Sequence, residues 1–449
     1  MKLETDSLRI LASALERLNM GFASLPDAAQ EYDSTAVSEV LLRVADRMQN
    51  NYPYFHPLYA GQMLKPPHVM ARLAYILSLW VNPNNHALDG GRASSQMEKE
   101  AVAALADMFA WESHLGHLTG GGTMANLEAL WISGKEHPGK YIVASEQAHY
   151  THGRISEVLC IPFRAIACDA NGRMDMPSLE EALGQGKVGT VVATMGTTGT
   201  GAVDPLEKIL ALRNKYKFRL HADAAYGGYF ILADGIEAKT MENLEGLRHV
   251  DSVVIDPHKH GLQPYGCGCI LLKDLSLGAY YKHDSPYTYF TSDELHLGEI
   301  SLECSRPGAG AVALWATQQL MPMVRDGEFA RSLTSSRLAA QALFGRLSAD
   351  SRFITIMPPE LDIVVWAVRG EKASQISHRT RQFFELAAQQ DLHLAVFNYP
   401  SKNLEPLWGG VVFDREQVLC LRSCLMKPEH RSWIDRIWQI MMEVITRIQ

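Results

Sequence analysis

The stretch Asp251–Gly261, DSVVIDPHKHG, joins a short apolar run to a lysine that stands between two histidines. The run from Val253 to Ile255 has the β-branched composition of a buried strand. Lys259 follows four residues after Ile255, where a solvated turn lysine or a nucleophilic amine held at a strand end would both fit. The rest of the chain decides between these two interpretations.

Six other short apolar runs resemble this one and alternate with segments of helical periodicity. They cover residues 114–119, 141–145, 163–168, 190–195, 218–223 and 267–273. Apolar runs separated by helical patterns are typical of parallel strands that are buried on both faces. The sequence therefore predicts an α/β fold with a seven-stranded, mostly parallel sheet.

The flanking segments have other patterns. Helical periodicity covers residues 6–19, 36–49, 67–81 and 96–110 before the first strand pattern. From about residue 326 a helix (332–347), a strand (361–368), a helix (373–390), two strand patterns (392–398 and 417–425) and a helix from Glu429 follow. We expect a helical arm (1–55), a large domain (56–325) and a small α+β domain (326–449). The polar and aromatic stretch 283–300 is predicted to be a long loop, either functional or a plain surface excursion.

Composition excludes several classes of protein. Hydrophobic residues make up 47% and charged residues 20% of the 449 residues, as in ordinary globular proteins. The net charge of −8, without a basic stripe, argues against nucleic acid as a partner. The most apolar segment, residues 73–81, is too short to span a membrane, which takes about 20 residues.

We expect a cytoplasmic protein that does not bind a membrane. Acids and arginines interrupt the apolar positions of the first 20 residues, unlike in a signal peptide. The seven cysteines are an odd number and show no CxxC spacing, which favours reduced, buried thiols.

Thr119–Thr123, TGGGT, lies between a strand pattern and a helical pattern. Glycines let the backbone approach an anion, and the free amides of a helix start attract phosphate. The turn is therefore a candidate phosphate site, although a glycine-rich turn can also be purely structural. It is not a nucleotide P-loop, because no Lys-Ser or Lys-Thr follows it.

Other polar residues also stand at predicted strand ends. Asp223, in His221–Ala225 (HADAA), falls where parallel sheets bind ligands, and a carboxylate there can keep a cofactor's ring nitrogen protonated or simply cap a helix. His149 follows the strand pattern 141–145, and Thr194 ends another. No metal is expected, because no carboxylate or third histidine stands at a ligand spacing from His258 and His260.

A phosphate cradle, a histidine ring, a carboxylate and a lysine amine thus follow successive strands of one sheet. Each matches a different part of pyridoxal phosphate: the phosphate, the ring face, the ring nitrogen and the aldehyde. The order of these pieces, rather than any one of them, predicts a pyridoxal phosphate site.

From HPLYAGQM (56–63) to LCLRSC (419–424), the chain resembles the group II pyridoxal phosphate-dependent amino acid decarboxylases, a family that includes aromatic amino acid, histidine and glutamate decarboxylases. SEQAH (145–149), HADAAY (221–226) and DPHK (256–259) occur in the order typical of that family. The resemblance implies the aspartate aminotransferase-type fold (fold type I) and a homodimer with the active site at the subunit interface. The N-terminal arm would wrap around the partner subunit.

The resemblance also implies roles for individual residues. Lys259 would form the Schiff base with the cofactor, His149 would stack on its ring and Asp223 would bind the ring nitrogen. Further cofactor contacts would come from Gly122, Thr123, Thr194, Ala225 and His258, and substrate contacts from Tyr59, Gln62, His260 and Arg422. In relatives the acid that reprotonates the substrate is often a loop tyrosine, for which residues 283–300 offer Tyr287 and Tyr289.

The implied reaction removes the α-carboxylate of an L-amino acid and yields carbon dioxide and the amine. His260-Gly261, Pro264-Tyr265-Gly266 and Ser305–Gly308 are closer to the branch that contains archaeal tyrosine or aspartate decarboxylases and sphingosine phosphate lyases. A carbon–carbon lyase and an aldehyde-forming oxidative decarboxylase therefore stay open as alternatives. The side chain of the substrate also stays open.

Overall fold

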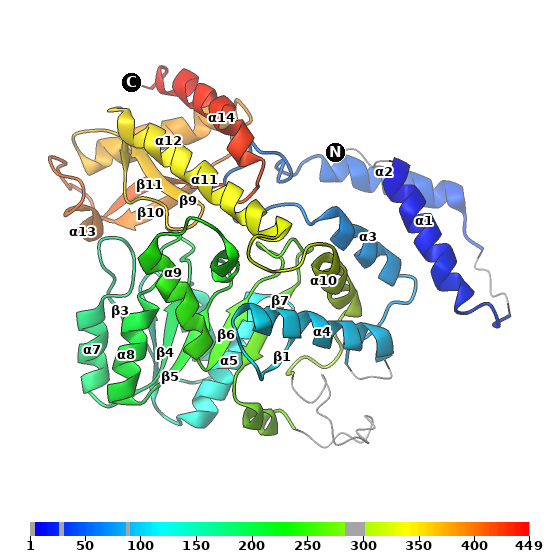
Figure 1. Cartoon of the computed structure of the whole chain (residues 1–449). Helices are drawn as coiled ribbons and strands as arrows, with labels where there is room; N and C mark the ends of the chain where they lie inside the picture. Colours follow the sequence, from blue (N-terminus) through cyan, green and yellow to red (C-terminus); the bar gives the residue numbers. More distant parts are fainter. Residues whose placement is uncertain (1–4, 27–30, 87–89, 283–300, 449) are drawn as a thin grey trace.

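The computed structural model describes residues 5–26, 31–86, 90–282 and 301–448 of the chain. Figure 1 shows two β-sheets, each with helices packed against it, and two N-terminal helices that lie to one side of this body. Four helices precede the first strand in the described part of the chain: α1 (Thr5–Met20), α2 (Ser34–Met48), α3 (Val69–Ser78) and α4 (Arg92–Met108).

The large sheet contains seven strands in the order β1-β7-β6-β5-β4-β2-β3. Their bounds are β1 Leu115–Thr119, β2 Tyr141–Ser145, β3 Phe163–Ile166, β4 Val188–Thr194, β5 Arg219–Asp223, β6 Ser252–Ile255 and β7 Gly268–Leu272. The pairs among β2 to β6 are parallel, whereas β7 runs antiparallel to both of its neighbours, β1 and β6. The predicted seven-stranded, mostly parallel sheet is confirmed, with strand bounds within two residues of those expected.

Helices connect the parallel strands, because a chain must cross from one end of the sheet to the other between two parallel strands and usually does so as a helix. They are α5 (Gly122–Glu136), α6 (Thr151–Val158), α7 (Met176–Gly184), α8 (Leu206–Tyr216) and α9 (Ala238–Glu245), with short 3-10 helices at Gly228–Leu232, Gly246–His249 and Leu275–Tyr280. Figure 1 shows α7, α8 and α9 side by side against the large sheet. The parallel strands end at one edge of the sheet, where their registers place Asp223 between Thr194 on β4 and Val254 on β6.

The small sheet is antiparallel, in the order β10-β11-β9-β8. Its strands are β8 Phe353–Thr355, β9 Ile363–Val368, β10 Ala395–Pro400 and β11 Gln417–Cys424, and α11 (Glu328–Ala349), α12 (Ala373–Ala388), α13 (Ser401–Leu404) and α14 (His430–Ile445) accompany it. Phe353, Trp366 and Phe383 form the aromatic centre of the core between this sheet and its helices. The expected α+β arrangement is present. Strand β8 and helix α10 (Gly308–Leu320), which packs on α3 and α4, were not expected.

The division of the chain at residues 55 and 325 stays a prediction. Ala60, which we placed in the large domain, contacts the small sheet: its N–H donates to the His393 carbonyl, and its own carbonyl accepts from the N–H of Cys424, both at 2.8 Å. The segment around Ala60 thus joins the core of the small sheet.

None of the helices in the described ranges has both the length and the apolar character needed to cross a membrane.

Candidate active site

A cavity of about 320 Å³ lies at the carboxyl-end edge of the large sheet. Eight of the residues singled out in the sequence line it: Gly122, Thr123, His149, Thr194, Asp223, Ala225, His258 and Lys259. They stand at or after the ends of β1, β2, β4, β5 and β6, and the sheet brings these ends together at the edge where open α/β folds bind their ligands.

The glycine turn forms one wall of this cavity. Gly121 has a φ of +144°, a backbone conformation that side chains disfavour, and Gly122 begins helix α5. A Cβ on Gly122 would lie 2.7 Å from Asp256 Oδ2, and a Cβ on Gly268 of β7 would lie 2.5 Å from the carbonyl carbon of Gly121. Close approach of backbone and carboxylate therefore requires glycine here, and the free amides of α5 face the cavity.

Asp223 ends the central strand β5 and is buried. Its Oδ2 accepts hydrogen bonds from His152 Nε2 (2.9 Å) and Asn126 Nδ2 (3.4 Å), and its Oδ1 accepts one from the N–H of Ala225 (3.2 Å). Burial by itself would raise the pKa of Asp223, but the hydrogen bond from His152 and the positive charges of His152 and Lys259 lower the pKa below its usual value. The carboxylate is therefore held ionised.

A line of hydrogen bonds supports Asp223 from behind. His221, on the same face of β5, has its Nε2 2.8 Å from Asn126 Oδ1 and its Nδ1 2.9 Å from Ser252 Oγ. Burial lowers the pKa of His221 to about 3, so its ring is neutral. The neutral ring donates to Asn126 and accepts from Ser252, which leaves the Asn126 amide free to donate to Asp223.

Lys259 lines the same cavity as Asp223 and stands beyond the end of β6. Its Nζ is 3.1 Å from Asp256 Oδ2, while Asp256 Oδ1 is buried and finds no hydrogen-bond partner in the described part of the chain. His258 Nδ1 is 2.8 Å from the Cys267 carbonyl, which directs its ring into the cavity wall beside the glycine turn. Burial lowers the pKa of His258, so this ring is neutral and donates from Nδ1.

Thr194 and His149 complete the lining. The hydroxyl of Thr194 is buried and has no hydrogen-bond partner within the described ranges, whereas its N–H donates to Asp204 Oδ2 (2.7 Å). Asp204 Oδ1 accepts from the N–H of Met174 (2.7 Å), and burial raises the pKa of Asp204 to about 7. His149 Nδ1 contacts Thr151 Oγ1 at 2.8 Å.

Tyr59, Gln62 and Arg422 form a second group beside the cavity. Arg422 donates from Nη2 to Gln62 Oε1 (2.8 Å) and from Nη1 to the carbonyl of Thr198, a residue that lines the cavity. The Tyr59 hydroxyl accepts from the N–H of Gln62 at 3.2 Å. The structure therefore brings together three residues that are up to 363 positions apart in the chain, and Arg422 joins them to the cavity lining through Thr198.

The structure does not bring His260 to the cavity lining. Its ring is fully buried against Tyr226 and Phe230, and neither ring nitrogen makes a hydrogen bond to another described residue. His260 Nε2 lies 3.3 Å from Asp362 Oδ2, but burial lowers the pKa of His260 well below 6.5, so the two do not form an ion pair. Tyr287 and Tyr289 lie outside the described residues.

Sequence reasoning missed His152, Asn126, Asp204 and Asp256 as parts of this site. His152 stands three residues after His149, in the first turn of α6, and its N–H donates to the His149 carbonyl at 3.1 Å, so a second histidine close behind the first was the available signal. Asp256 stands inside the quoted DPHK motif, so its position was available as a signal.

The residues present fit pyridoxal phosphate. The carboxylate of Asp223 can pair with the protonated ring nitrogen, and the free amides at the start of α5 can bind the phosphate. The amine of Lys259 can react with the aldehyde, and the Thr194 hydroxyl, which has no partner among the described residues, offers a further donor. Within the part of the chain that the structure describes, no three His, Cys, Asp or Glu side chains are grouped as metal ligands would be. Fold and cavity together define the class of pyridoxal phosphate enzymes of fold type I.

Comparison with known proteins identifies the family within that class. The model of the pyridoxal-dependent decarboxylase conserved domain matches residues 137–369, just over half of the chain. L-2,4-diaminobutyrate decarboxylase of Rhizobium meliloti is 30% identical over 352 residues, covering 73% of this chain and 68% of that protein. A probable L-tyrosine/L-aspartate decarboxylase of Methanothermobacter thermautotrophicus is 29% identical, covering 68% of this chain and 82% of that protein.

Among solved structures, Oryza sativa TDC with PLP and tryptamine has a TM-score of 0.78 at 18% identity and covers 100% of this chain and 99% of its own. This likeness confirms the predicted fold.

The chain belongs to the pyridoxal-dependent decarboxylases. It is an enzyme that decarboxylates an amino acid with pyridoxal phosphate as cofactor. The lyase and oxidative alternatives are not favoured, because the relatives are named as amino acid decarboxylases.

Substituting Gly122→Ala should weaken cofactor binding. The added Cβ would lie 2.7 and 2.9 Å from the two carboxylate oxygens of Asp256, so the turn must shift at a cost of about 1–3 kcal/mol. We expect the dissociation constant for pyridoxal phosphate, measured by absorbance titration of the apoprotein, to rise by about tenfold or more. Gly345→Ala, where an added Cβ meets nothing within 4 Å on helix α11, is the matched control. Unchanged affinity in Gly122→Ala would contradict the role of the close contact.

Proposed function

We propose that Lys259 binds the cofactor covalently and that Asp223 pairs with its ring nitrogen. The observation that carries this assignment is that Lys259, Asp223 and the first turn of α5 face one cavity of about 320 Å³. Gly122, Thr123 and His258 would receive the phosphate, since they lie together at the amide end of α5. His149 and Ala225 would lie against the ring.

Pyridoxal phosphate, when bound, supplies an electron sink for the electron pair that remains after a carboxylate leaves as carbon dioxide. Asp223 holds a proton at the ring nitrogen, because a buried anion favours a cation beside it. His152 and Asn126 keep the Asp223 carboxylate ionised and prevent it from rotating. Hydrogen bonds that are already made before the reaction cost no reorganisation during it.

Arg422 is our candidate for the group that binds the substrate carboxylate. Its guanidinium contacts Thr198 at the cavity lining, and its buried Nε has no hydrogen-bond partner among the residues that the structure describes. Gln62, and through it Tyr59, hold the guanidinium in place. A planar, fixed guanidinium suits a carboxylate. Roles for His260 in specificity and for Tyr287 or Tyr289 as the acid stay predictions.

Lys259→Ala should abolish the covalent bond to the cofactor. We expect loss of the borohydride-sensitive visible absorbance of the purified protein and a fall in turnover of at least about 10³-fold, because the nucleophilic amine is gone. Lys208→Ala, on the exposed face of α8, is the control and should retain both signals. Full absorbance in Lys259→Ala would show that another amine carries the cofactor.

We propose that the substrate loses its α-carboxylate and becomes the corresponding amine. The relatives named above act on aromatic, acidic or basic amino acids, so carboxyl-labelled tyrosine, aspartate and 2,4-diaminobutyrate belong in one screen with the other common amino acids. We expect labelled carbon dioxide and an equal amount of amine from at least one of them. An aldehyde product without the amine would instead favour the oxidative alternative.

We propose that the protein is a homodimer held in part by the N-terminal arm. Helices α1 and α2 have no buried residue, and α2 exposes a helical stripe of large apolar side chains: Val37, Val40, Leu41, Val44 and Met48. Figure 1 shows both helices beyond α3, away from the two sheets. An exposed apolar stripe of this size on a helix is typical of an interface.

The double variant Leu41→Glu/Val44→Glu should shift the protein toward the monomer. Two charges in the α2 stripe would have to be buried in the interface, which costs far more than exposure to water. We expect the unmodified protein to sediment at twice the 49.9 kDa chain mass and the variant at the chain mass. Val412→Glu, at an exposed apolar position after the small helix α13, is the control. If the unmodified protein sediments as a monomer, the proposal of a homodimer is wrong.

We further propose a cytoplasmic location. All seven cysteines are free thiols in the structure, as expected in a reducing compartment. Fractionation of cells that express the untagged chain tests this location, and recovery from a secreted or organellar fraction would contradict it.

A further inference from the structure

A buried ion pair caps the free edge of the large sheet next to the glycine turn. Strand β1 is one of the two edge strands and, among the described residues, pairs with a strand, β7, on one side alone. At Leu118, near its end, the N–H donates to Glu98 Oε1 (2.9 Å) and the carbonyl accepts from Arg306 Nη1 (2.7 Å). Arg306 Nη1 also lies 2.7 Å from Glu98 Oε1. Side chains from α4 and from the start of the α10 segment thus complete the backbone bonding of β1 two residues before Gly120.

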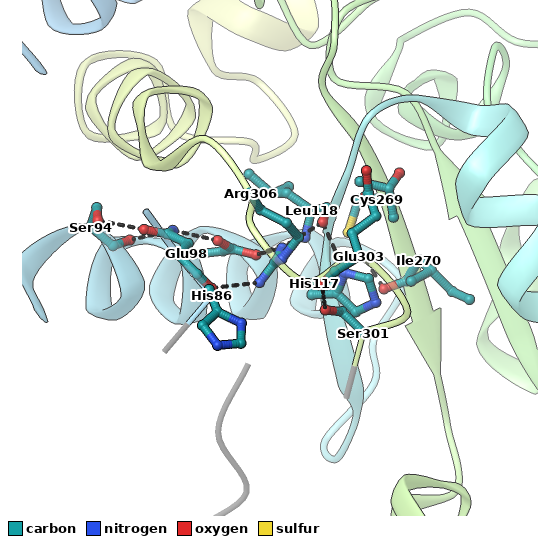
Figure 2. A network of polar contacts seen from close by, with 12 residues as sticks. His86, Ser94, Glu98, His117, Leu118, Cys269, Ile270, Ser301, Glu303 and Arg306 are labelled. Carbon is teal, nitrogen blue, oxygen red and sulfur yellow. Dashed lines mark hydrogen bonds and ion pairs between the residues drawn. The ribbon is translucent and has the colours of Figure 1, made fainter. Parts of the chain in front are cut away.

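The Glu98–Arg306 pair is enclosed. Glu98 is 1% and Arg306 5% exposed, and Asn85 binds both partners: its Nδ2 donates to Glu98 Oε2, and its carbonyl accepts from Arg306 Nη2 at 3.2 Å. Figure 2 shows the pair between α4 and the end of β1. A buried ion pair contributes little net stability compared with an apolar pair of the same volume, so a role in fixing geometry accounts better for its presence.

The same carbonyl of Leu118 links the pair to helix α5. His117 Nδ1 lies 2.8 Å from this oxygen, and His117 Nε2 lies 2.8 Å from Glu128 Oε2 on α5. Both side chains are buried. A continuous series of polar contacts therefore joins α4, the end of β1 and α5, the three elements that surround the turn 119–123.

The segment before Arg306 also reaches the turn. Glu303 Oε2 accepts from the N–H of Gly120 at 3.3 Å, and the Glu303 carbonyl accepts from Ser301 Oγ at 2.8 Å (Figure 2). Glu98 and Arg306 themselves do not line the cavity. Their influence on anything bound there must pass through the backbone of the turn.

We propose that Glu98 and Arg306 are positioning residues for the phosphate of the cofactor. They bind the N–H and the carbonyl of Leu118 on the side of β1 that faces away from β7. This contact fixes the direction in which residues 119–123 leave β1, and therefore the direction in which the free amides of α5 point. Hydrogen bonds to charged groups inside a protein are stronger and more directional than neutral ones, which suits this task. The proposal rests on the assignment of the turn to the phosphate.

The test compares pyridoxal phosphate with pyridoxal, which lacks the phosphate. Apoprotein of the full chain is titrated with each compound, and the dissociation constants are measured by absorbance. In Glu98→Gln, which keeps an acceptor for Leu118 but loses the charge, we expect the constant for pyridoxal phosphate to rise by about tenfold or more, while that for pyridoxal changes by less than about twofold. Arg306→Lys, which keeps the charge but lacks the planar fork, should give the same pattern.

Glu360→Gln is the matched control, because Glu360 is also a buried carboxylate paired with an arginine, Arg173, but lies outside the cavity lining. It should leave both constants unchanged. Circular dichroism of each apoprotein shows whether the variant has folded. If Glu98→Gln or Arg306→Lys has not folded, the dissociation constants of the other variant test the proposal.

Equal weakening of both compounds, or no weakening, in folded Glu98→Gln and Arg306→Lys would overturn the positioning role. Failure of the phosphate assignment itself would look different: the unmodified protein would then bind pyridoxal as tightly as pyridoxal phosphate.

Discussion

The site depends on the burial of one negative charge, the carboxylate of Asp223, at the end of the central strand of the large sheet. An uncompensated buried carboxylate is costly, so each of its oxygens must find donors. His152 and Asn126 bring α6 and α5 to Oδ2, and the N–H of Ala225 serves Oδ1. The hydrogen bonds to the Asp223 carboxylate therefore hold α5 and α6 against the sheet. The cavity lies beside this carboxylate, between the segments that the hydrogen bonds hold in place.

The second wall of the cavity follows from close backbone packing. Strand β7 runs antiparallel between β1 and β6, which places Gly268 against Gly121 and the Cys267 carbonyl against the ring of His258. The glycine turn and the segment that contains Lys259 are more than 130 residues apart in the chain. The start of β7 contacts both of them. The absence of side chains at Gly121 and Gly268 makes this contact possible.

Prediction from the sequence succeeded where a pattern is local. The strands of the large sheet were found from short, mainly apolar runs, and β4 and β6 are buried along their whole length, as strands of a parallel sheet are when helices cover both faces. Strand β8 has three residues, too few for any period to appear. Helix α10 is rich in small and apolar residues on most sides, since it packs on both α3 and α4, and so lacks the polar face that marks a surface helix.

By itself, the sequence determined which residues stand at strand ends and the chemistry that they offer: a lysine, an aspartate, a histidine and a glycine turn in one order. These depend on local periodicity and residue type. The tertiary structure alone decided that Arg422 reaches Thr198, that the ring of His260 turns into the core, and that an ion pair from α4 and the α10 segment closes the edge of β1. Such contacts depend on strand order and on packing between distant segments, which no local pattern in the chain encodes.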